Sequence, residues 1–262
     1  VHQDRAEITH RFDSLSVSPS GRIYVAWVDK RDLIAARKAK QTYDGAAIYY
    51  AVSDDAGASF STEHKVADSS SKCCRIAMLA DEQGNAVMMW RHLFDGGVRD
   101  HVMAKLGANE ATPKIHRASF GNWKIDACPH HGPALAKGGD WGYHMAWFDG
   151  GDKAGLFYAR MDGEAWVSSP AKRFGDANNQ AGHPALISDG EQVWLAWKEM
   201  TDTASLVKLA KSNDGGRSWD APIVISQTKG KSDYPQLLLK GTQAYLAWNT
   251  EAEGLVWTKV AQ

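Results

Sequence analysis

The chain has 262 residues, of which 44% are hydrophobic and 23% are charged, and its formal net charge at pH 7 is −1. This composition supplies enough apolar side chains for a large buried core, so it excludes an intrinsically disordered or fibrous chain. A net charge near zero lacks the basic footprint of proteins that bind nucleic acid or anionic membranes, so we expect neither partner. No apolar run approaches the roughly 18 residues of a membrane-spanning helix, so we also expect no membrane span.

Five short segments, each ending in tryptophan, reveal an internal repeat. Trp27 and Trp248 are 221 residues apart, about 55 residues for each of the four steps between them, which is the size of a four-stranded propeller blade. Around these segments apolar side chains alternate with a period of two, as in antiparallel β-structure. The repeated tryptophans are Trp27, Trp90, Trp147, Trp197 and Trp248.

The predicted strands follow this repeat in chain order. First strands begin near Phe12, Arg75, Pro133, His183 and Pro235, and the fourth repeat is clearest, with strands at 183–187, 193–197, 206–211 and 222–225. The last repeat ends after a third strand at 255–260. We expect residues 2–9 to supply its missing strand, because closing the ring leaves no open sheet edge. The prediction is an all-β, single-domain β-propeller over residues 1–262, with five four-stranded blades, or six as the alternative.

Two further segments, 53–60 and 212–219, share the pattern Ser-x-Asp-x-Gly-x-Ser-aromatic. Within a tight turn, the carboxylates of Asp55 and Asp214 can accept backbone N–H bonds, while Gly57 and Gly216 supply positive φ angles. These turns resemble the Asp-box, or bacterial neuraminidase repeat, of sialidase-like β-propellers. In that family the Asp-boxes lie on the face opposite the active site, so the resemblance implies that both turns are structural.

The resemblance also implies a search for sialidase residues, namely three arginines that bind the substrate carboxylate, a Tyr nucleophile helped by a Glu, and an Asp acid/base. Arg11 falls where the first arginine of that family would lie. The surrounding His10-Arg11-Phe12-Asp13 differs from the family's Phe/Tyr-Arg-Ile-Pro, and the later arginines and the Tyr/Glu pair have no matching positions.

In a propeller, the loops that enter the first strands and those that join second to third strands lie on one face, at the mouth of the central channel. All three cysteines fall on the entering loops, together with several histidines. Thiolates and imidazoles are the ligands of copper and zinc. We therefore expect a copper site, or a zinc site as the alternative, with ligands from Cys73, Cys74, Cys128, His130, His131 and His183, and with His92 and His101 as weaker candidates. Arg99, Asp100 and His101 could orient those ligands.

Other interpretations of the cysteines stay open. Cys73 or Cys74 could form a disulfide with Cys128, or the thiols could be inert and buried. Both the metal and the disulfide favour export, and the chain starts at Val1 without a charged leader and apolar core. We therefore expect a periplasmic or secreted protein whose signal peptide has been removed.

Three functions follow from this sequence. The first is an exported propeller that binds copper for metal handling or redox chemistry. The second is a sialidase-like glycoside hydrolase acting on an acidic sugar, with Arg11, Arg91 and Arg99 binding its carboxylate and Asp29 as the acid; Asp100 is a further weak catalytic candidate. Asp13, Asp149 and Glu199 are other acids that could form a catalytic pair. The third is a non-catalytic interaction propeller in which the cysteines are structural.

Overall fold

The computed structural model describes residues 1–73, 75–81, 83–107, 112–127 and 129–260. Strands dominate, and the helices are α1 (Arg31–Lys38) and the short 3-10 turns η1 (Asp95–Gly97) and η2 (Ala177–Asn179). None of the helices in these ranges has the length and hydrophobicity needed to cross a bilayer. The chain divides into two compact units, Val1–Gly132 (unit 1) and Pro133–Gln262 (unit 2).

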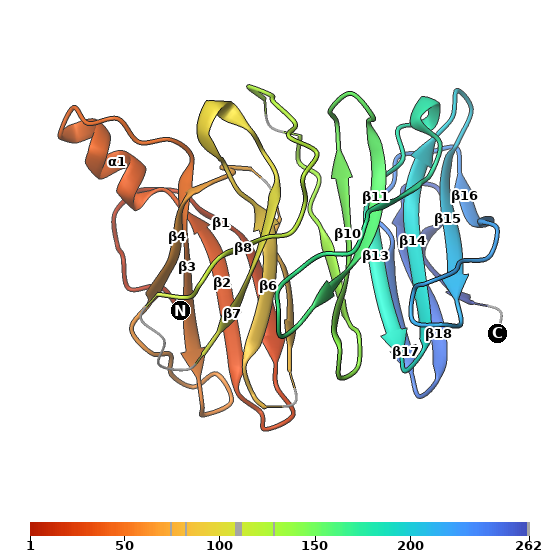
Figure 1. Cartoon of the computed structure of the whole chain (residues 1–262), viewed down its shortest axis with the longest axis horizontal. Coiled ribbons are helices and arrows are strands. Elements are labelled where there is room, and N and C mark those ends of the chain that lie inside the picture. The colour runs from red at the N-terminus through yellow and green to blue at the C-terminus, as the bar shows by residue number, and fades with distance from the viewer. Residues whose placement is uncertain (74, 82, 108–111, 128, 261–262) are drawn as a thin grey trace. The chain divides into compact units, whose positions relative to one another are not determined.

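Unit 1 contains two four-stranded sheets in which each strand pairs antiparallel with its neighbour in the chain (Figure 1). The first strands of the two sheets, β1 and β5, pack against each other. The first sheet consists of β1 (His10–Val17), β2 (Ile23–Asp29), β3 (Ala46–Ser53) and β4 (His64–Ser70). The second consists of β5 (Ala77–Ala80), β6 (Ala86–Arg91), β7 (His101–Leu106) and β8 (His116–Arg117).

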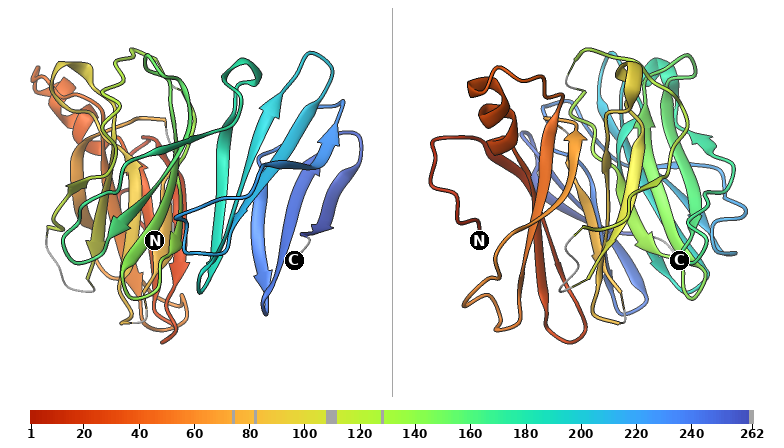
Figure 2. Two further views of the ribbon diagram at one scale, coloured as in Figure 1. Left: turned by 45° about the vertical axis from the view of Figure 1, so that its right-hand side comes forward. Right: turned by 60° about the vertical axis from the view of Figure 1, so that its left-hand side comes forward.

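Unit 2 contains three sheets built in the same way, and Figure 2 shows their strands running side by side from two further directions. Strand β13 contacts both β9 and β17, so the first strands again bring neighbouring sheets together. The first sheet comprises β9 (Ala134–Lys137), β10 (Gly142–Asp149), β11 (Gly155–Asp162) and β12 (Lys172–Phe174). The next comprises β13 (Gly182–Asp189), β14 (Gln192–Met200), β15 (Ser205–Ser212) and β16 (Ile223–Thr228), and the last β17 (Gln236–Lys240), β18 (Gln243–Thr250) and β19 (Gly254–Lys259).

The tryptophan repeat is confirmed as a structural position. All five residues lie on the second strand of their sheets, on β2, β6, β10, β14 and β18, and all are buried. The indole N–H groups of four of them, Trp27, Trp90, Trp197 and Trp248, have acceptors, for example Ser70 Oγ at 3.0 Å from Trp90 Nε1 and the Asp233 carbonyl at 3.0 Å from Trp248 Nε1. These four large side chains therefore fill the core without leaving their polar atoms unsatisfied.

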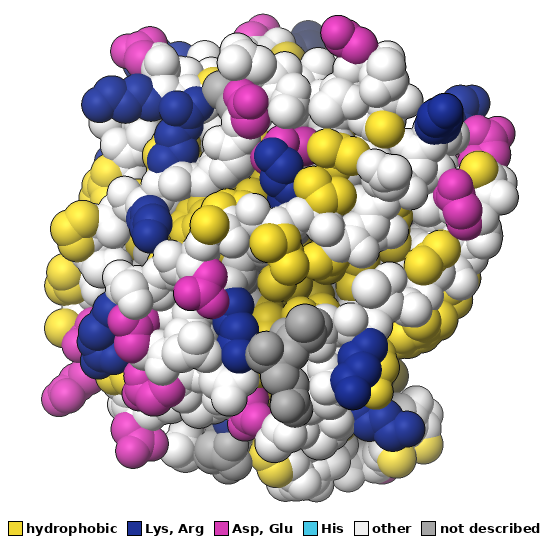
Figure 3. All heavy atoms as spheres, turned by 90° about the vertical axis from the view of Figure 1, so that its right-hand side faces the viewer, with side chains coloured by type: hydrophobic (Ala, Val, Ile, Leu, Met, Phe, Trp, Pro, Cys, Tyr) yellow, Lys and Arg dark blue, Asp and Glu magenta, His cyan; other side chains and the backbone are white. Residues whose placement is uncertain are grey.

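The expected closing strand is not found at the N-terminus. Residues 2–9 form no strand, and within the described residues the last sheet has only three strands. The segment instead contacts unit 1, since Gln3 N donates to the Glu63 carboxylate at 3.1 Å and the His2 ring stacks on His10 with centroids 4.0 Å apart. These contacts hold the N-terminal segment against Glu63 and His10, so the prediction that it supplies a closing strand is wrong. The last sheet keeps Leu255 and Trp257 of β19 exposed, and Figure 3, which views its side of the molecule, shows hydrophobic side chains gathered there.

The two repeated turns have the predicted hydrogen bonds. Asp55 Oδ1 accepts from Ser59 N at 2.8 Å, and Asp214 Oδ1 accepts from Ser218 N at 2.8 Å. Gly57 and Gly216 have φ angles of +86° and +81°. Hydrogen bonds from the Ser59 side chain and backbone lower the pKa of Asp55 to about 2, so its carboxylate is ionised and occupied within its own turn.

Candidate ligand-binding site in unit 1

Among the predicted metal ligands and catalytic candidates, His183, Asp149 and Glu199 belong to unit 2 and the others to unit 1, and Cys74 and Cys128 lie outside the described residues. His183 is on β13 in unit 2, where its ring stacks on Tyr234 at a centroid distance of 3.7 Å. The unit 1 residues come from the start of β1, the loops before β5 and β9, and the loop that joins β6 to β7.

Arg91, the last residue of β6, is the buried centre of this region. Only 1% of it is exposed, its Nη1 donates to the Arg99 carbonyl at 3.1 Å, and its guanidinium lies 4.9 Å from the centre of the Trp123 ring. Burial, with the nearby charges of Arg91 and His130, lowers the pKa of His131 to about 4. Burial and Arg91 also hold the pKa of His101 well below its ordinary value. A permanent positive charge is thus surrounded by neutral imidazoles at pH 7.

The structure brings together the two cysteine-bearing segments of the sequence. A Cβ placed at Gly132 would lie 2.7 Å from the Cβ of Arg75, so the backbone after His131 runs directly against the segment that follows Cys73. Cys73 is buried, with its sulfur 3.8 Å from Ser71 Oγ, and Ser71 N donates to the Arg91 carbonyl at 2.9 Å. These contacts join the Cys73 segment to Arg91.

Arg11 reaches the same region through Phe12. Its guanidinium lies 4.2 Å from the Phe12 ring centre, and that ring is 6.3 Å from the ring of His130. No group of three or more His, Cys, Asp or Glu side chains arranged for metal binding occurs within the described ranges. The predicted ligand set depends on Cys74 and Cys128 as well, so the copper site stays a prediction.

A cleft of about 540 Å³ opens beside this region. The chain can bend sharply along its wall because Gly96 and Gly97 have φ angles of +70° and +77°. The lining includes cations, carboxylates and an aromatic ring, namely Lys72, Arg99, Asp44, Asp95, Asp126 and Phe94.

Arg99 is the cation in this cleft with spare hydrogen-bonding capacity. Its Nη1 donates to the Ala127 carbonyl at 3.1 Å, and a carboxylate oxygen of the fully exposed Asp126 lies 4.0 Å from Nη2. Its buried Nε has no hydrogen-bond partner within the described part of the chain, but a ligand cannot reach a buried atom. The side chain is 14% exposed, so the part of the guanidinium that lines the cleft can bind an anion.

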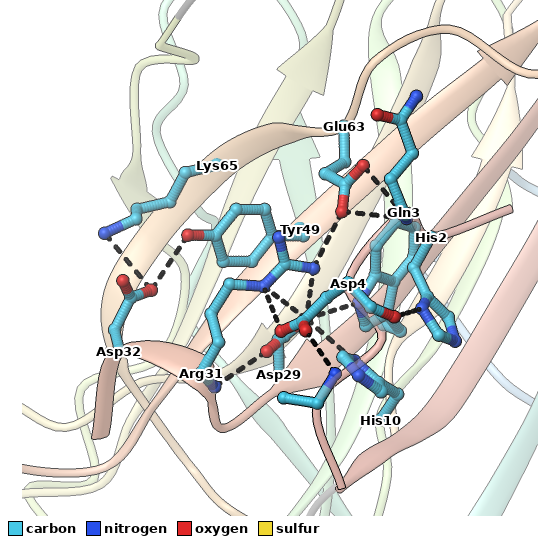
Figure 4. A network of polar contacts seen from close by, with 12 residues as sticks. His2, Gln3, Asp4, His10, Asp29, Arg31, Asp32, Tyr49, Glu63 and Lys65 are labelled. Carbon is cyan, nitrogen blue, oxygen red and sulfur yellow. Dashed lines mark hydrogen bonds and ion pairs between the residues drawn. The ribbon is translucent and has the colours of Figure 1, made fainter. Parts of the chain in front are cut away.

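Asp29 lies in a separate, closed network of unit 1 (Figure 4). It accepts hydrogen bonds from Trp27 Nε1 at 2.9 Å and from Arg31 Nη2 at 2.8 Å, and His10 Nδ1 lies 2.9 Å from the same carboxylate. Burial alone would raise the pKa of Asp29, but the bonds from Arg31 and Trp27 outweigh it and lower the pKa. An ionised carboxylate held in this way is a poor proton donor, so this network gives the acid role of Asp29 no support and the role stays a prediction.

Asp100 positions another side chain. It is fully buried, forms an ion pair with Arg117, and accepts from Asn122 N at 3.2 Å and from Ser119 Oγ at 3.3 Å. These contacts make Asp100 the anchor of Arg117 on β8 and of the segment that follows it, whereas the sequence suggested a weak catalytic candidate.

Glu199 on β14 borders a second cleft, of about 450 Å³ and entirely within unit 2. It accepts from Trp197 Nε1 at 2.7 Å and pairs with Lys208 Nζ at 2.8 Å. Burial raises its pKa, but the bonds from Lys208 and Trp197 outweigh this effect and lower it. Asp29 and Glu199 each follow a repeated tryptophan by two residues, and this spacing is the sequence pattern that could have identified both carboxylates. No repeated pattern in the sequence identifies Lys72, Phe94 or Arg117 as neighbours of the unit 1 cleft.

No protein-family model matches the chain, and no curated protein is similar in sequence. Several solved structures are similar. A protein of unknown function from Dyadobacter fermentans has a TM-score of 0.63 at 12% identity, over 99% of this chain and 80% of that one. The GH93 α-L-arabinofuranosidase of Fusarium graminearum, in complex with arabinobiose, has a TM-score of 0.62 at 11% identity, over 100% of this chain and 85% of the enzyme.

A PL25 ulvan lyase bound to -[GlcA(1-4)Rha3S]- has a TM-score of 0.52 at 12% identity over 95% of this chain, which spans 64% of the length of that lyase. Sequence identities this low support conclusions about architecture only. The likeness shows that the chain has a fold of the β-propeller type.

Proposed function

We propose that this protein binds and cleaves an anionic polysaccharide, using the unit 1 cleft that Arg99 lines. The observation that carries the proposal is Arg99 itself, a cation that lines the cleft, is 14% exposed, and lies 4.0 Å from the exposed carboxylate of Asp126. Guanidinium groups match the geometry of carboxylates and sulfates and form the stronger class of hydrogen bond with them.

The fold supports an enzyme that acts on glycans. The similar structures include an arabinofuranosidase and a polysaccharide lyase, and the sugar bound by the lyase carries glucuronate and sulfate groups. Two cations of the cleft, Lys72 and Arg99, could pair with such groups, although the carboxylates of Asp44, Asp95 and Asp126 line it as well. This reading is the glycan-active alternative from the sequence, with an acidic sugar as ligand.

The histidines beside Arg91 are neutral at pH 7, as a proton acceptor must be. Burial, with Arg91 nearby, lowers the pKa of His131 to about 4, so this imidazole would be a weak general base. Arg91 contacts the wall of the cleft through its hydrogen bond to the Arg99 carbonyl, 3.1 Å away.

Titration of the protein with anionic and neutral polysaccharides, followed by analysis of the products, tests this function. We expect binding of an acidic polymer, and we expect Arg99→Ala to weaken it by about 10- to 100-fold, the loss of one charge-assisted hydrogen-bonding group. Arg173→Ala, which removes an arginine from the unit 2 cleft, is the matched control. Equal binding by Arg99→Ala and the wild type would contradict the proposal.

A transition-metal site is the second candidate, favoured by the contact of Arg75 with Gly132, which brings the Cys73 and His131 segments together. We propose copper first and zinc second, for metal handling or redox chemistry in the periplasm or outside the cell. Elemental analysis of protein purified without added metal should find one equivalent, reduced in Cys73→Ser. A metal-free protein that takes up neither ion on titration would refute the site.

A further inference from the structure

Side chains at the edge of the unit 1 cleft form a layered stack. The ring of His92 meets that of Phe94 edge-on, at 5.0 Å between centroids and an interplanar angle of 75°. The Arg117 guanidinium carbon lies 4.5 Å from the Phe94 ring centre and 5.0 Å from the Phe120 ring centre. The Arg117 guanidinium therefore makes cation–π contacts with two aromatic rings.

Hydrogen bonds fix the guanidinium at the centre of this stack. Arg117 pairs with the buried carboxylate of Asp100, and it donates to Asn122 Oδ1 at 2.7 Å and to the Ser119 carbonyl at 3.1 Å. All of these acceptors lie at the edge of the guanidinium plane, where its N–H groups point, so its faces stay available to the rings. The stack is held in place before any ligand arrives.

Phe120 is the solvent-exposed end of this stack. It is 61% exposed, whereas Phe94, the other ring in contact with Arg117, lines the cleft with Arg99. The stack therefore leads from the wall of the cleft to an exposed, rigidly supported aromatic ring. Such a ring loses little conformational freedom when it binds a ligand, and aromatic anchors of this kind dominate many binding surfaces.

We propose that Phe120 is a sugar-stacking platform, which binds a ring of the polysaccharide beyond the sugar whose charged group is held by Arg99. The face of a pyranose ring presents C–H groups that pack on an aromatic ring. Lys124, whose Nζ lies 3.9 Å from the Cβ position of Gly96 at the cleft, could pair with an anionic group of the polymer, whereas the charge of Arg117 is already paired with Asp100. This inference rests on the proposed function and adds that the ligand is an extended chain.

The test compares a polymer with its building block. Calorimetric titration uses an anionic polysaccharide, such as polyglucuronate, and the free uronic acid as probes. We expect Phe120→Ala to weaken polymer binding about tenfold, the loss of one aromatic anchor, and to leave uronic acid binding unchanged. Phe120→Trp should retain polymer binding. Trp257→Ala, which removes a ring of similar exposure (58%) in unit 2, is the control and should bind as the wild type does.

The outcomes separate this inference from the proposed function. If Arg99→Ala weakens both probes while Phe120→Ala binds the polymer like the wild type, the platform is refuted and the anion-binding cleft stands. If the wild type binds neither probe, the proposed function fails and the platform fails with it. Arg117→Lys keeps the charge but loses the planar group that contacts both rings, so it should weaken polymer binding while leaving uronic acid binding intact.

Discussion

Asp29 and Glu199 occupy the same position in two sheets of different units, yet their surroundings differ. Each follows a buried tryptophan by two residues on the second strand and accepts a hydrogen bond from that indole, at 2.9 Å for Asp29 and 2.7 Å for Glu199. Each also pairs with a cation at 2.8 Å, Arg31 for Asp29 and Lys208 for Glu199.

The difference lies in what surrounds the cation. Arg31 also pairs with Glu63 at 2.9 Å and with Asp4 at 3.7 Å, and its guanidinium lies 4.3 Å from the Tyr49 ring centre, so the N-terminal segment and the first sheet close around it (Figure 4). Lys208 and Glu199 instead line an open cleft. A repeated sequence position therefore fixes the packing of the tryptophan but leaves the carboxylate free to serve as an internal brace or as part of a cleft.

Removing the cation should have its largest effect in the closed network. Arg31→Met leaves several carboxylates without their main partner, and we expect it to lower the free energy of unfolding by about 3–5 kcal/mol. Lys208→Met should cost about 1–2 kcal/mol, because Glu199 keeps its bonds from Trp197 and the Asp176 backbone and the cleft admits water. Urea unfolding measures both, and equal losses would show that the two sites are equivalent.

A smaller effect should appear in the pH dependence of stability. Both carboxylates have a pKa lowered by folding, so each stabilises the fold above its unfolded value, 3.8 for Asp29 and 4.5 for Glu199, and that contribution disappears as the pH falls through the folded value. We expect the free energy of unfolding to fall below about pH 4.5. Asp29→Asn and Glu199→Gln should each flatten this decline, as measured by urea unfolding along a pH series. An unchanged slope in Asp29→Asn would contradict the role of its ion pair.

The sequence predicted more of the fold than of the site. The tryptophan positions located the second strands, and 183–187, 193–197, 206–211 and 222–225 match β13 to β16 closely because alternation and turn residues are local signals. The sequence placed residues 2–9 wrongly, as a closing strand, since their partners, such as Glu63, are far away in the chain. It named Asp29 and Asp100 as catalytic candidates, because the ion pairs that bury them, with Arg31 and Arg117, cannot be recognised from a sequence pattern.

The smallest predicted effect concerns single outer hydrogen bonds. His10→Phe removes one contact of Asp29 in the closed network and should lower the free energy of unfolding by about 1 kcal/mol. Asn179→Ala removes the 3.3 Å contact to Glu199 beside the open cleft, where water can replace it, and should change stability by less than about 0.5 kcal/mol. Thermal melts of the two variants in parallel check the difference, and a larger loss in Asn179→Ala would reverse the comparison.

The pairing of every strand with its neighbour in the chain has an evolutionary consequence. No sheet borrows a strand from a distant part of the described chain, so each one is encoded by a single continuous stretch of about 50 residues. Duplication or loss of one such stretch in the gene adds or removes a whole sheet while the hydrogen-bonding register of the others is untouched. The number of sheets can therefore change without any rearrangement of the surviving ones, which lets a site confined to one unit, such as the Arg99 cleft, persist through changes elsewhere.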